Sequence, residues 1–324
     1  MPLAEDDNRV RILKTAFVSY SHADLTKARQ FLLDFGLKIE KEEPGKIIFF
    51  RGYGPEPICY VARQSEHGQS SFDGGAFEVE SREELEKAIK QIPGATEIYE
   101  LDGYPGGGEA VTLTDPAGYK CHLVLGQQPR IPDPPPREKL VLNFETEKSR
   151  LGRFHRVPPG PAPVYRWSHV GVAYPIGTFQ EMFDWYTKNL SFAPSDILTR
   201  DGKPSTCFLH IDRGEEFTDH HAFFIKSAKP HAKPDVAHAA FEVHDLDVQQ
   251  LGHQHLENQG YKLCWGVGRH LLGSQIFDYW FDPSQFVVEH YADGDMVNKD
   301  TPVGSIPAGP EALSVWGPAV PAVF

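Results

Sequence analysis

The sequence predicts an α+β protein of two similar modules, each using a strand–helix–strand–strand–strand unit twice. Three observations lead to this prediction. The tetrapeptide AFEV occurs at 76–79 and again at 240–243. An Asp-Pro pair lies between strand-like runs at 115–116 and again at 282–283, and a proline-rich stretch separates the two halves. A repeat of this length indicates two consecutive modules rather than a short-period solenoid.

The first module is expected over residues 1–127. Alternating apolar residues at 16–20 predict its opening strand, and Ser21 or Asp24 is placed to cap a helix that ends at Gly36. Two strands follow in IIFFRGYG and EPICYVAR, where glycine and proline mark the breaks. The second unit repeats this order, with a strand through AFEV, a helix, and two strands joined at the Asp-Pro turn.

The second module is expected over residues 165–294. WSHVGVAY and the run after it repeat the opening strand and helix, and YWFDPSQFVVEHY repeats the closing pair of strands. Superposing Tyr20 on Tyr174 brings the elements into register. A proline-rich linker is expected at 128–164 and an irregular tail at 295–324. We expect the sheets to curve around a cavity, with the helices on the outer face.

The composition indicates a soluble globular protein. The 324 residues are 40% hydrophobic and 24% charged. A net charge of −13 without a basic stripe argues against a nucleic-acid partner. No apolar run resembles a signal peptide or reaches the length of a membrane span, so no membrane association is expected. The four cysteines are scattered without a CxxC pair, which is typical of a reducing compartment and predicts a cytoplasmic protein.

Three residues of the second module lie at matched places on different predicted strands. They are His169, His238 and Glu289. A carboxylate after Val-Val is unusual in a core strand, because a buried charge is costly unless it is paired or bound to a metal. Two imidazoles and one carboxylate on neighbouring strands can form a facial triad that leaves one side of an iron ion open. Zinc also accepts two histidines and a glutamate with an open position.

The repeat supplies an internal comparison for this set. In the Tyr20–Tyr174 superposition the first module carries Thr15, Gly74 and His122 at the three places. Only one potential ligand remains, so the first module is expected to hold no metal.

Three further residues point to acid–base chemistry near this site. They are His221, the second histidine of TDHHAFFI, His270 in the loop GRH, and Tyr279 in FDYWF. A histidine can remove a proton from a phenol and return one later, and a second histidine and a tyrosine can hydrogen-bond substrate oxygens. The alternatives are a strand-edge role for His221, a turn role for His270 and a core role for Tyr279.

The sequence GRH, a tyrosine nine residues on and a glutamate ten further on resembles the signature of type I extradiol ring-cleaving dioxygenases. These belong to the vicinal oxygen chelate superfamily. The likeness covers nearly the whole chain as two tandem vicinal-oxygen-chelate modules, with the metal in the half-barrel of the second. It implies His169, His238 and Glu289 as metal ligands, His221 as the acid–base residue, and His270 and Tyr279 as partners of the substrate oxygens.

The resemblance also implies a reaction. The metal would be Fe(II), with Mn(II) in a minority of members, and the substrates a catechol and O2. Cleavage beside the diol would give a muconic semialdehyde-type product. A homo-oligomer is expected as well. The tail and the bulky pair Phe223 and Phe224 bear on the choice of catechol.

Two other classes remain open from the sequence. A metal-dependent isomerase, lyase or α-keto-acid oxygenase would use the same three ligands without the second set of residues. A non-catalytic small-molecule binding protein of the same fold would usually lack the ligands.

Overall fold

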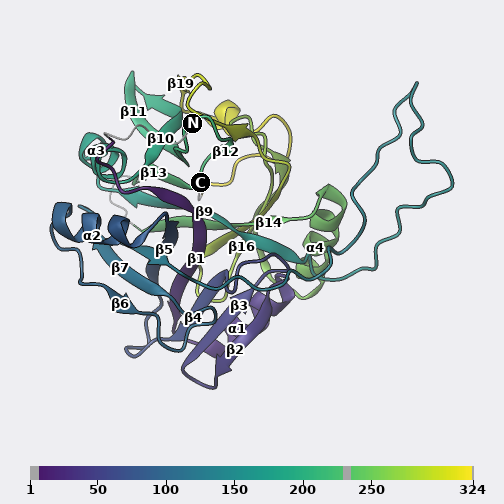
Figure 1. Cartoon of the computed structure of the whole chain (residues 1–324). Coiled ribbons are helices and arrows are strands. Elements are labelled where there is room, and N and C mark those ends of the chain that lie inside the picture. Colours follow the sequence, from purple (N-terminus) through teal and green to yellow (C-terminus); the bar gives the residue numbers. More distant parts are fainter. Residues whose placement is uncertain (1–6, 229–234, 323–324) are drawn as a thin grey trace.

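The computed structural model describes residues 7–228 and 235–322 and shows two modules, each built on one curved sheet with two helices (Figure 1). The first module contains β1 (Ile12–His22), α1 (Leu25–Asp34), β2 (Lys38–Glu43), β3 (Ile47–Arg51), β4 (Tyr60–Gln64), β5 (Ser71–Val79), α2 (Arg82–Gln91), β6 (Tyr99–Glu100), β7 (Glu109–Thr114) and β8 (Lys120–Leu125).

The second module follows the same order. It contains β9 (Val164–Tyr174), α3 (Phe179–Asn189), β10 (Phe192–Arg200), β11 (Lys203–Ile211), β12 (Thr218–Asp219), β13 (Phe223–Ser227), β14 (Val236–Val243), α4 (Leu246–Asn258), β15 (Lys262–Arg269), β16 (Ile276–Phe281) and β17 (Val287–Ala292), with β18 (Met296–Val297), β19 (Gly304–Pro307) and a 3₁₀ turn (Pro310–Ala312) after it.

Each sheet joins its two βαβββ units through their first strands. In the first module the strand order is β2-β3-β4-β1-β5-β8-β7-β6, with β1 and β5 antiparallel at the centre. In the second module it is β15-β16-β17-β14-β9-β13-β11-β10-β19, with β9 and β14 antiparallel at the centre. The predicted α+β class and the two tandem modules are confirmed. None of the helices in the described ranges is long and apolar enough to cross a membrane.

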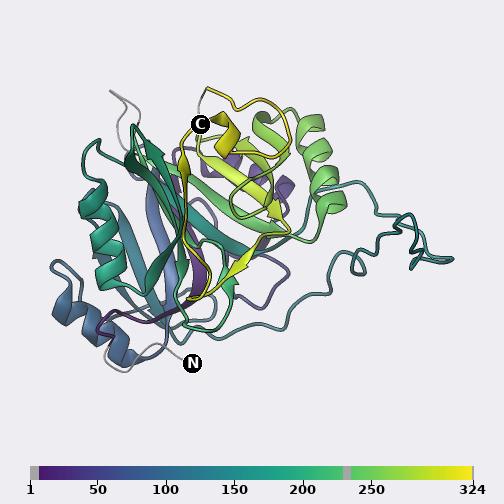
Figure 2. The same ribbon diagram turned by 90° about the horizontal axis from the view of Figure 1, so that it is seen from above.

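The helices lie on the outside of the sheets (Figures 1 and 2). Asp24 caps α1 by accepting a hydrogen bond from the backbone N–H of Lys27, and Asp245 caps α4 in the same way from Val248. Of the two caps considered for the first helix, Asp24 is the one used. One face of α1 buries Leu25, Ala28, Phe31 and Leu32, and of these Leu25, Phe31 and Leu32 belong to the shared core.

The structural register between the modules differs from the predicted one. β1 pairs Phe17 with Ala76, whereas β9 pairs His169 with Ala240. Since 76–79 and 240–243 are the same tetrapeptide, Phe17 is the counterpart of His169. The predicted equivalence of His169 with Thr15 is therefore wrong by two residues. Thr15 instead donates its hydroxyl hydrogen to the carbonyl of Trp167, across the contact between the modules.

Both Asp-Pro turns dock on the opposite module. Asp115 of the first turn accepts a hydrogen bond of 2.8 Å from the hydroxyl of Tyr186 on α3. Ser284 of the second turn lies 2.8 Å from Nδ1 of His22 at the end of β1. The His290 ring also stacks on Phe35 with 3.7 Å between ring centroids. These buried contacts join the modules into one unit around a shared core.

The linker between the modules and the C-terminal tail differ in their secondary structure. Residues 126–163 contain no helix or strand, and most of them stand away from the body as a long loop between β8 and β9 (Figures 1 and 2). The tail is not wholly irregular, contrary to prediction. Its strand β19 pairs in parallel with β10 and adds a ninth strand to the second sheet.

Candidate metal centre

Three adjacent strands of the second module bring His169, His238 and Glu289 together. Ala240 of β14 pairs with His169 on one side and with Glu289 on the other. His238 lies two residues before Ala240, so it shares that face of the sheet. His169 and Glu289 lie inside β9 and β17 rather than at their ends. The pairing of these three strands thus brings three side chains of metal-ligand type to one point.

The ligand atoms have the spacing that one ion requires. Nε2 of His169 and Nε2 of His238 are 3.3 Å apart, and they lie 3.2 Å and 3.3 Å from Oε2 of Glu289. Two atoms that bind one ion at about 2.1 Å lie about 3.0 Å apart at a right angle and about 3.4 Å apart at the tetrahedral angle. The observed distances fall between these values, so a single first-row metal ion fits among them.

Burial and charge also fit a cation at this point. Glu289 is fully buried, and neither of its oxygens makes a hydrogen bond of normal geometry to the described residues. Burial alone would raise the pKa of Glu289, but His169 and His238 outweigh it and hold that pKa below its usual value. Burial lowers the pKa of His238 to about 4, against the opposing effect of Glu289. At neutral pH the set contains a carboxylate and a neutral His238, which are the forms that bind metal.

His270 and Tyr279 form a hydrogen-bonded pair beside the carboxylate. Nε2 of His270 lies 2.7 Å from the hydroxyl of Tyr279 and 3.8 Å from Oε1 of Glu289. Nδ1 of His270 lies 2.6 Å from the carbonyl of Leu313 in the tail, and a carbonyl can only accept. A neutral His270 therefore carries its hydrogen on Nδ1 and accepts from Tyr279 through Nε2. Burial, followed by the charge of Glu289, raises the pKa of Tyr279 well above its usual value.

His221 approaches the same point from the other side. It lies just before β13, and its ring centroid is 4.1 Å from that of His169. It is 4% exposed, and burial together with the neighbouring imidazoles, first His169, lowers its pKa well below the usual value. The structure thus brings all six residues predicted for the site around one point, although the sequence spreads them over 121 positions, from 169 to 289.

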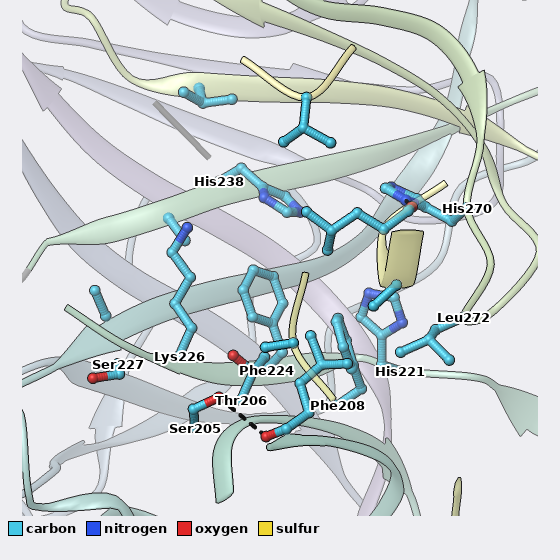
Figure 3. Close-up of a pocket in the computed structure, with 18 of the residues that line it drawn as sticks. Ser205, Thr206, Phe208, His221, Phe224, Lys226, Ser227, His238, His270 and Leu272 are labelled. Carbon is cyan, nitrogen blue, oxygen red and sulfur yellow. Dashed lines mark hydrogen bonds between the residues drawn. The ribbon is translucent and has the colours of Figure 1, made fainter. Parts of the chain in front are cut away.

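A cavity of about 560 Å³ opens on these residues. His221 and His270 lie toward one end, and Lys226 and Ser227 lie toward the other (Figure 3). His238 and Tyr279 also line the cavity. The rest of the lining is largely apolar and includes Phe208, Phe224, Leu272, Phe281, Val287 and Leu313. The volume of the cavity suits a small organic molecule.

Gly171 shapes the floor of this cavity. A side chain at Gly171 would collide with the Phe224 ring, since an added Cβ would lie 1.8 Å from its Cζ. Phe224 can therefore lie against β9 instead of filling the cavity.

The first module has a cavity of about 430 Å³ in the corresponding place, but not the ligands. Phe17 and His122 line it, and a Cβ at Gly74 would lie 2.8 Å from Nε2 of His122. Both nitrogens of His122 are already engaged, Nδ1 by Thr112 and Nε2 by the carbonyl of Asp73. That this module holds no metal stays a prediction.

The sequence did not identify several residues that line or support the site. The tail contributes Gly309, Ala312, Leu313 and Val320 to the cavity wall, and Trp265 donates its indole N–H to the carbonyl of Pro318. The tail was expected to bear on substrate choice, but its irregular sequence gave no pattern to place it. Phe208 faces the cavity from β11, and no motif marks it.

Comparison with known proteins finds a family model that matches the second module. Residues 167–290 match the model of the glyoxalase/bleomycin resistance protein/dioxygenase superfamily. Over 161 residues the chain is 32% identical to metapyrocatechase 2 of Cupriavidus necator. This alignment covers 49% of the chain and 46% of that protein, so the chain spans about half the length of the curated relative it matches.

Solved structures extend the likeness of the fold to both modules. The Mn(II)-bound glyoxalase from Novosphingobium aromaticivorans superposes with a TM-score of 0.76 at 22% identity, over 97% of this chain and 94% of that one. Homoprotocatechuate 2,3-dioxygenase from Brevibacterium fuscum, in complex with 3,4-dihydroxyphenylacetate, superposes with a TM-score of 0.76 at 19% identity. The superposition covers 98% of this chain and 93% of that one. LapB, a 2,3-dioxygenase from Pseudomonas sp. KL28, superposes with a TM-score of 0.73 at 17% identity, over 92% of this chain and 98% of that one. The vicinal-oxygen-chelate fold predicted from the sequence is confirmed.

Proposed function

We propose that this chain, whose second module carries a domain of the glyoxalase/bleomycin resistance protein/dioxygenase superfamily, is an Fe(II)-dependent extradiol catechol dioxygenase. The observation that carries the proposal is the convergence of two residue sets on one cavity. His169, His238 and Glu289 form a metal-binding face. His221, His270 and Tyr279 line the cavity with His238. The likeness to metapyrocatechase 2 supports the same reading.

The ligand set favours iron over zinc for this reaction. Two histidines and one carboxylate with open positions are typical of non-haem Fe(II) oxygenases, and zinc has no redox chemistry. His169, His238 and Glu289 would hold an Fe(II) ion, which would supply the redox chemistry by which a catechol reacts with O2. Mn(II) is the alternative metal. Homo-oligomeric assembly stays a prediction.

The chain's own residues would handle the protons. Nδ1 of His221 faces away from the cavity toward His220, at 3.1 Å, which leaves Nε2 to accept a proton from a substrate hydroxyl. The hydroxyl of Tyr279 lies 2.7 Å from Nε2 of His270 and lines the cavity, where its oxygen can accept a hydrogen bond from a second substrate hydroxyl. The buried, largely apolar wall would exclude water from the reacting ring. These are the positioning and proton-transfer tasks that catechol cleavage requires.

A metal-dependent isomerase or lyase is the second candidate. It is favoured by one observation: the Mn(II)-bound glyoxalase superposes as well as the dioxygenase from Brevibacterium fuscum. Such an enzyme would not consume O2.

An oxygen electrode distinguishes these two functions. The protein is loaded anaerobically with Fe(II), and a panel of catechols is added in aerobic buffer. The proposal predicts O2 uptake equal to the catechol consumed, together with a yellow ring-opened product. Turnover without O2, or with Zn(II) or Ni(II) in place of Fe(II), would favour the isomerase or lyase. Rates over the panel would also identify the preferred catechol.

Removing the end of the tail should weaken turnover without removing the metal. A chain truncated after Pro307 keeps β19 but loses Leu313 and Val320 from the wall, and with Leu313 the acceptor of His270 Nδ1. We expect kcat/KM to fall about 10–100-fold, because one buried apolar side chain or hydrogen bond contributes about 1–3 kcal/mol. Steady-state kinetics at matched iron content measure this effect. An unchanged kcat/KM would show that the tail does not shape the site.

A further inference from the structure

A chain of polar contacts runs from the cavity toward the outer edge of the second sheet. Nδ1 of His221 lies 3.1 Å from Nδ1 of His220, and Nε2 of His220 lies 2.7 Å from Oδ2 of Asp196. His221 and His220 are each 4% exposed, and the Asp196 side chain is 17% exposed. Apart from His221, none of the six residues of the site described above takes part in this chain.

The fold makes room for these side chains and fixes them. The backbone N–H of His220 donates to the carbonyl of Asp295, and its carbonyl accepts from Ser195. Gly273 packs on the His220 ring, where an added Cβ would lie 2.9 Å from Nδ1. Gly304 of β19 packs on Asp196, where an added Cβ would lie 1.8 Å from Oδ1. Two glycines from different segments therefore leave space for this histidine–aspartate pair.

The order of donors along the chain follows from Asp196. A carboxylate only accepts, so Nε2 of His220 carries a hydrogen. A neutral His220 then accepts at Nδ1, which requires His221 to donate from its own Nδ1. The remaining nitrogen of His221, Nε2, is left without a hydrogen on the cavity side. The carboxylate at the far end thus selects the tautomer of His221 that can take up a proton from a substrate.

We propose that Asp196 and His220 are positioning residues that hold His221 in the Nδ1–H tautomer and aim its Nε2 at the substrate. This inference rests on the proposed function for its catalytic consequence. When Nε2 of His221 accepts the proton of a catechol hydroxyl, the imidazolium that forms is stabilised by donation to His220, which is itself held by the negative charge of Asp196. No hydrogen leaves the chain, and the proton stays on His221 until it is returned.

Nuclear magnetic resonance of ¹⁵N-histidine-labelled, Zn(II)-loaded protein tests the tautomer without any turnover. The proposal predicts that His221 in the unaltered protein is neutral with its hydrogen on Nδ1. In Asp196→Asn the amide can donate to Nε2 of His220, so the chain can reverse and the Nε2–H form of His221 should appear. A His221 with its hydrogen on Nε2 in the unaltered protein would overturn the proposal.

Kinetics of the Fe(II)-loaded protein test the consequence. Asp196→Asn should lower kcat about tenfold or more, with iron content, melting temperature and KM for catechol little changed. In a His221→Ala background the same change should have no further effect on kcat, since both act through one nitrogen. Asp184→Asn is the matched control, because Asp184 makes its contacts on the surface of α3. A loss of kcat that persists in the His221→Ala background would contradict the positioning role.

Failure of the proposed function would look different from failure of this inference. An unaltered protein that consumes no O2 with any catechol would refute the dioxygenase assignment. The tautomer measurement would still decide whether Asp196 and His220 hold His221 in the Nδ1–H tautomer.

Discussion

Glu289→Gln is expected to abolish stable metal binding and all O2-dependent turnover, while leaving the fold intact. Glutamine keeps the volume of the side chain but removes the buried negative charge that faces His169 and His238. Changes to residues that only orient a metal ligand already lower metal affinity about 10–100-fold, so loss of a ligand should cost at least that much. Metal analysis of anaerobically loaded protein measures the effect directly.

The stability of the metal-free protein provides a second signature. Glu289 is a fully buried charge without a conventional hydrogen bond in the described part of the chain. Because His169 and His238 stabilise the ionised carboxylate, removing that charge should not raise the melting temperature of the metal-free protein. Added Fe(II) should raise the melting temperature of the unaltered protein but not that of the variant.

The repeat provides a matched control for this experiment. His122 occupies the place of Glu289 in the first module, since each pairs with the alanine of its AFEV tetrapeptide. His122→Gln should therefore leave the metal content at one ion per chain. If His122→Gln lost the metal and Glu289→Gln kept it, the metal centre would lie in the first module, contrary to the proposal.

The His221→Ala variant is expected to keep its iron and lose turnover. His221 contacts the ring of His169, but it is not among the three residues whose ligand atoms converge. A positioned general acid–base group contributes about 10²–10⁴-fold to rate, so kcat should fall by that factor with KM much less affected. Stopped-flow and steady-state kinetics on protein of equal iron content measure this split.

The exposed His67 offers a control for the loss of a histidine as such. His67→Ala should keep the full kcat. If His221→Ala instead turned over catechol at the original rate, the proton would have to be handled by another group, and His270 would be the next residue to replace.

Residue chemistry and strand order were enough to predict the ligand set. Glu289 after two valines is a charge that a core strand cannot hold alone, and His169 and His238 stand at matched places on other predicted strands. Parallel and antiparallel pairing around AFEV then placed His169 and Glu289 on either side of Ala240, as the ladder shows.

The alignment of the two opening strands could not be fixed in the same way. Side chains of a strand alternate with a period of two, so a slip of two residues keeps every buried residue on its face. The tyrosine chosen as an anchor, Tyr20, fell two residues away from the true counterpart of Tyr174, which is His22. In the observed register the burial patterns of β1 and β9 differ only where the exposed Lys14 corresponds to the half-buried Arg166.

Contacts that depend on the tail and on paired side chains were not predictable. The strand β19 reads GSIP, too short and too poor in alternation to signal a strand, yet it places Gly304 against Asp196. The doubled histidine in TDHHAFFI was the signal available for His220. Nothing in the sequence links it to Asp196, which lies 24 residues earlier and meets it only through the fold.

The most direct test of the central claim is the fate of isotopically labelled oxygen. Fe(II)-loaded protein is mixed with a catechol under ¹⁸O₂, and the product is analysed by mass spectrometry. Extradiol cleavage at this centre predicts incorporation of oxygen from ¹⁸O₂ into an acyclic product opened beside the diol, with one O2 consumed per catechol. An intact quinone with the label recovered in water or hydrogen peroxide, or an isomerised product without label, would contradict the account.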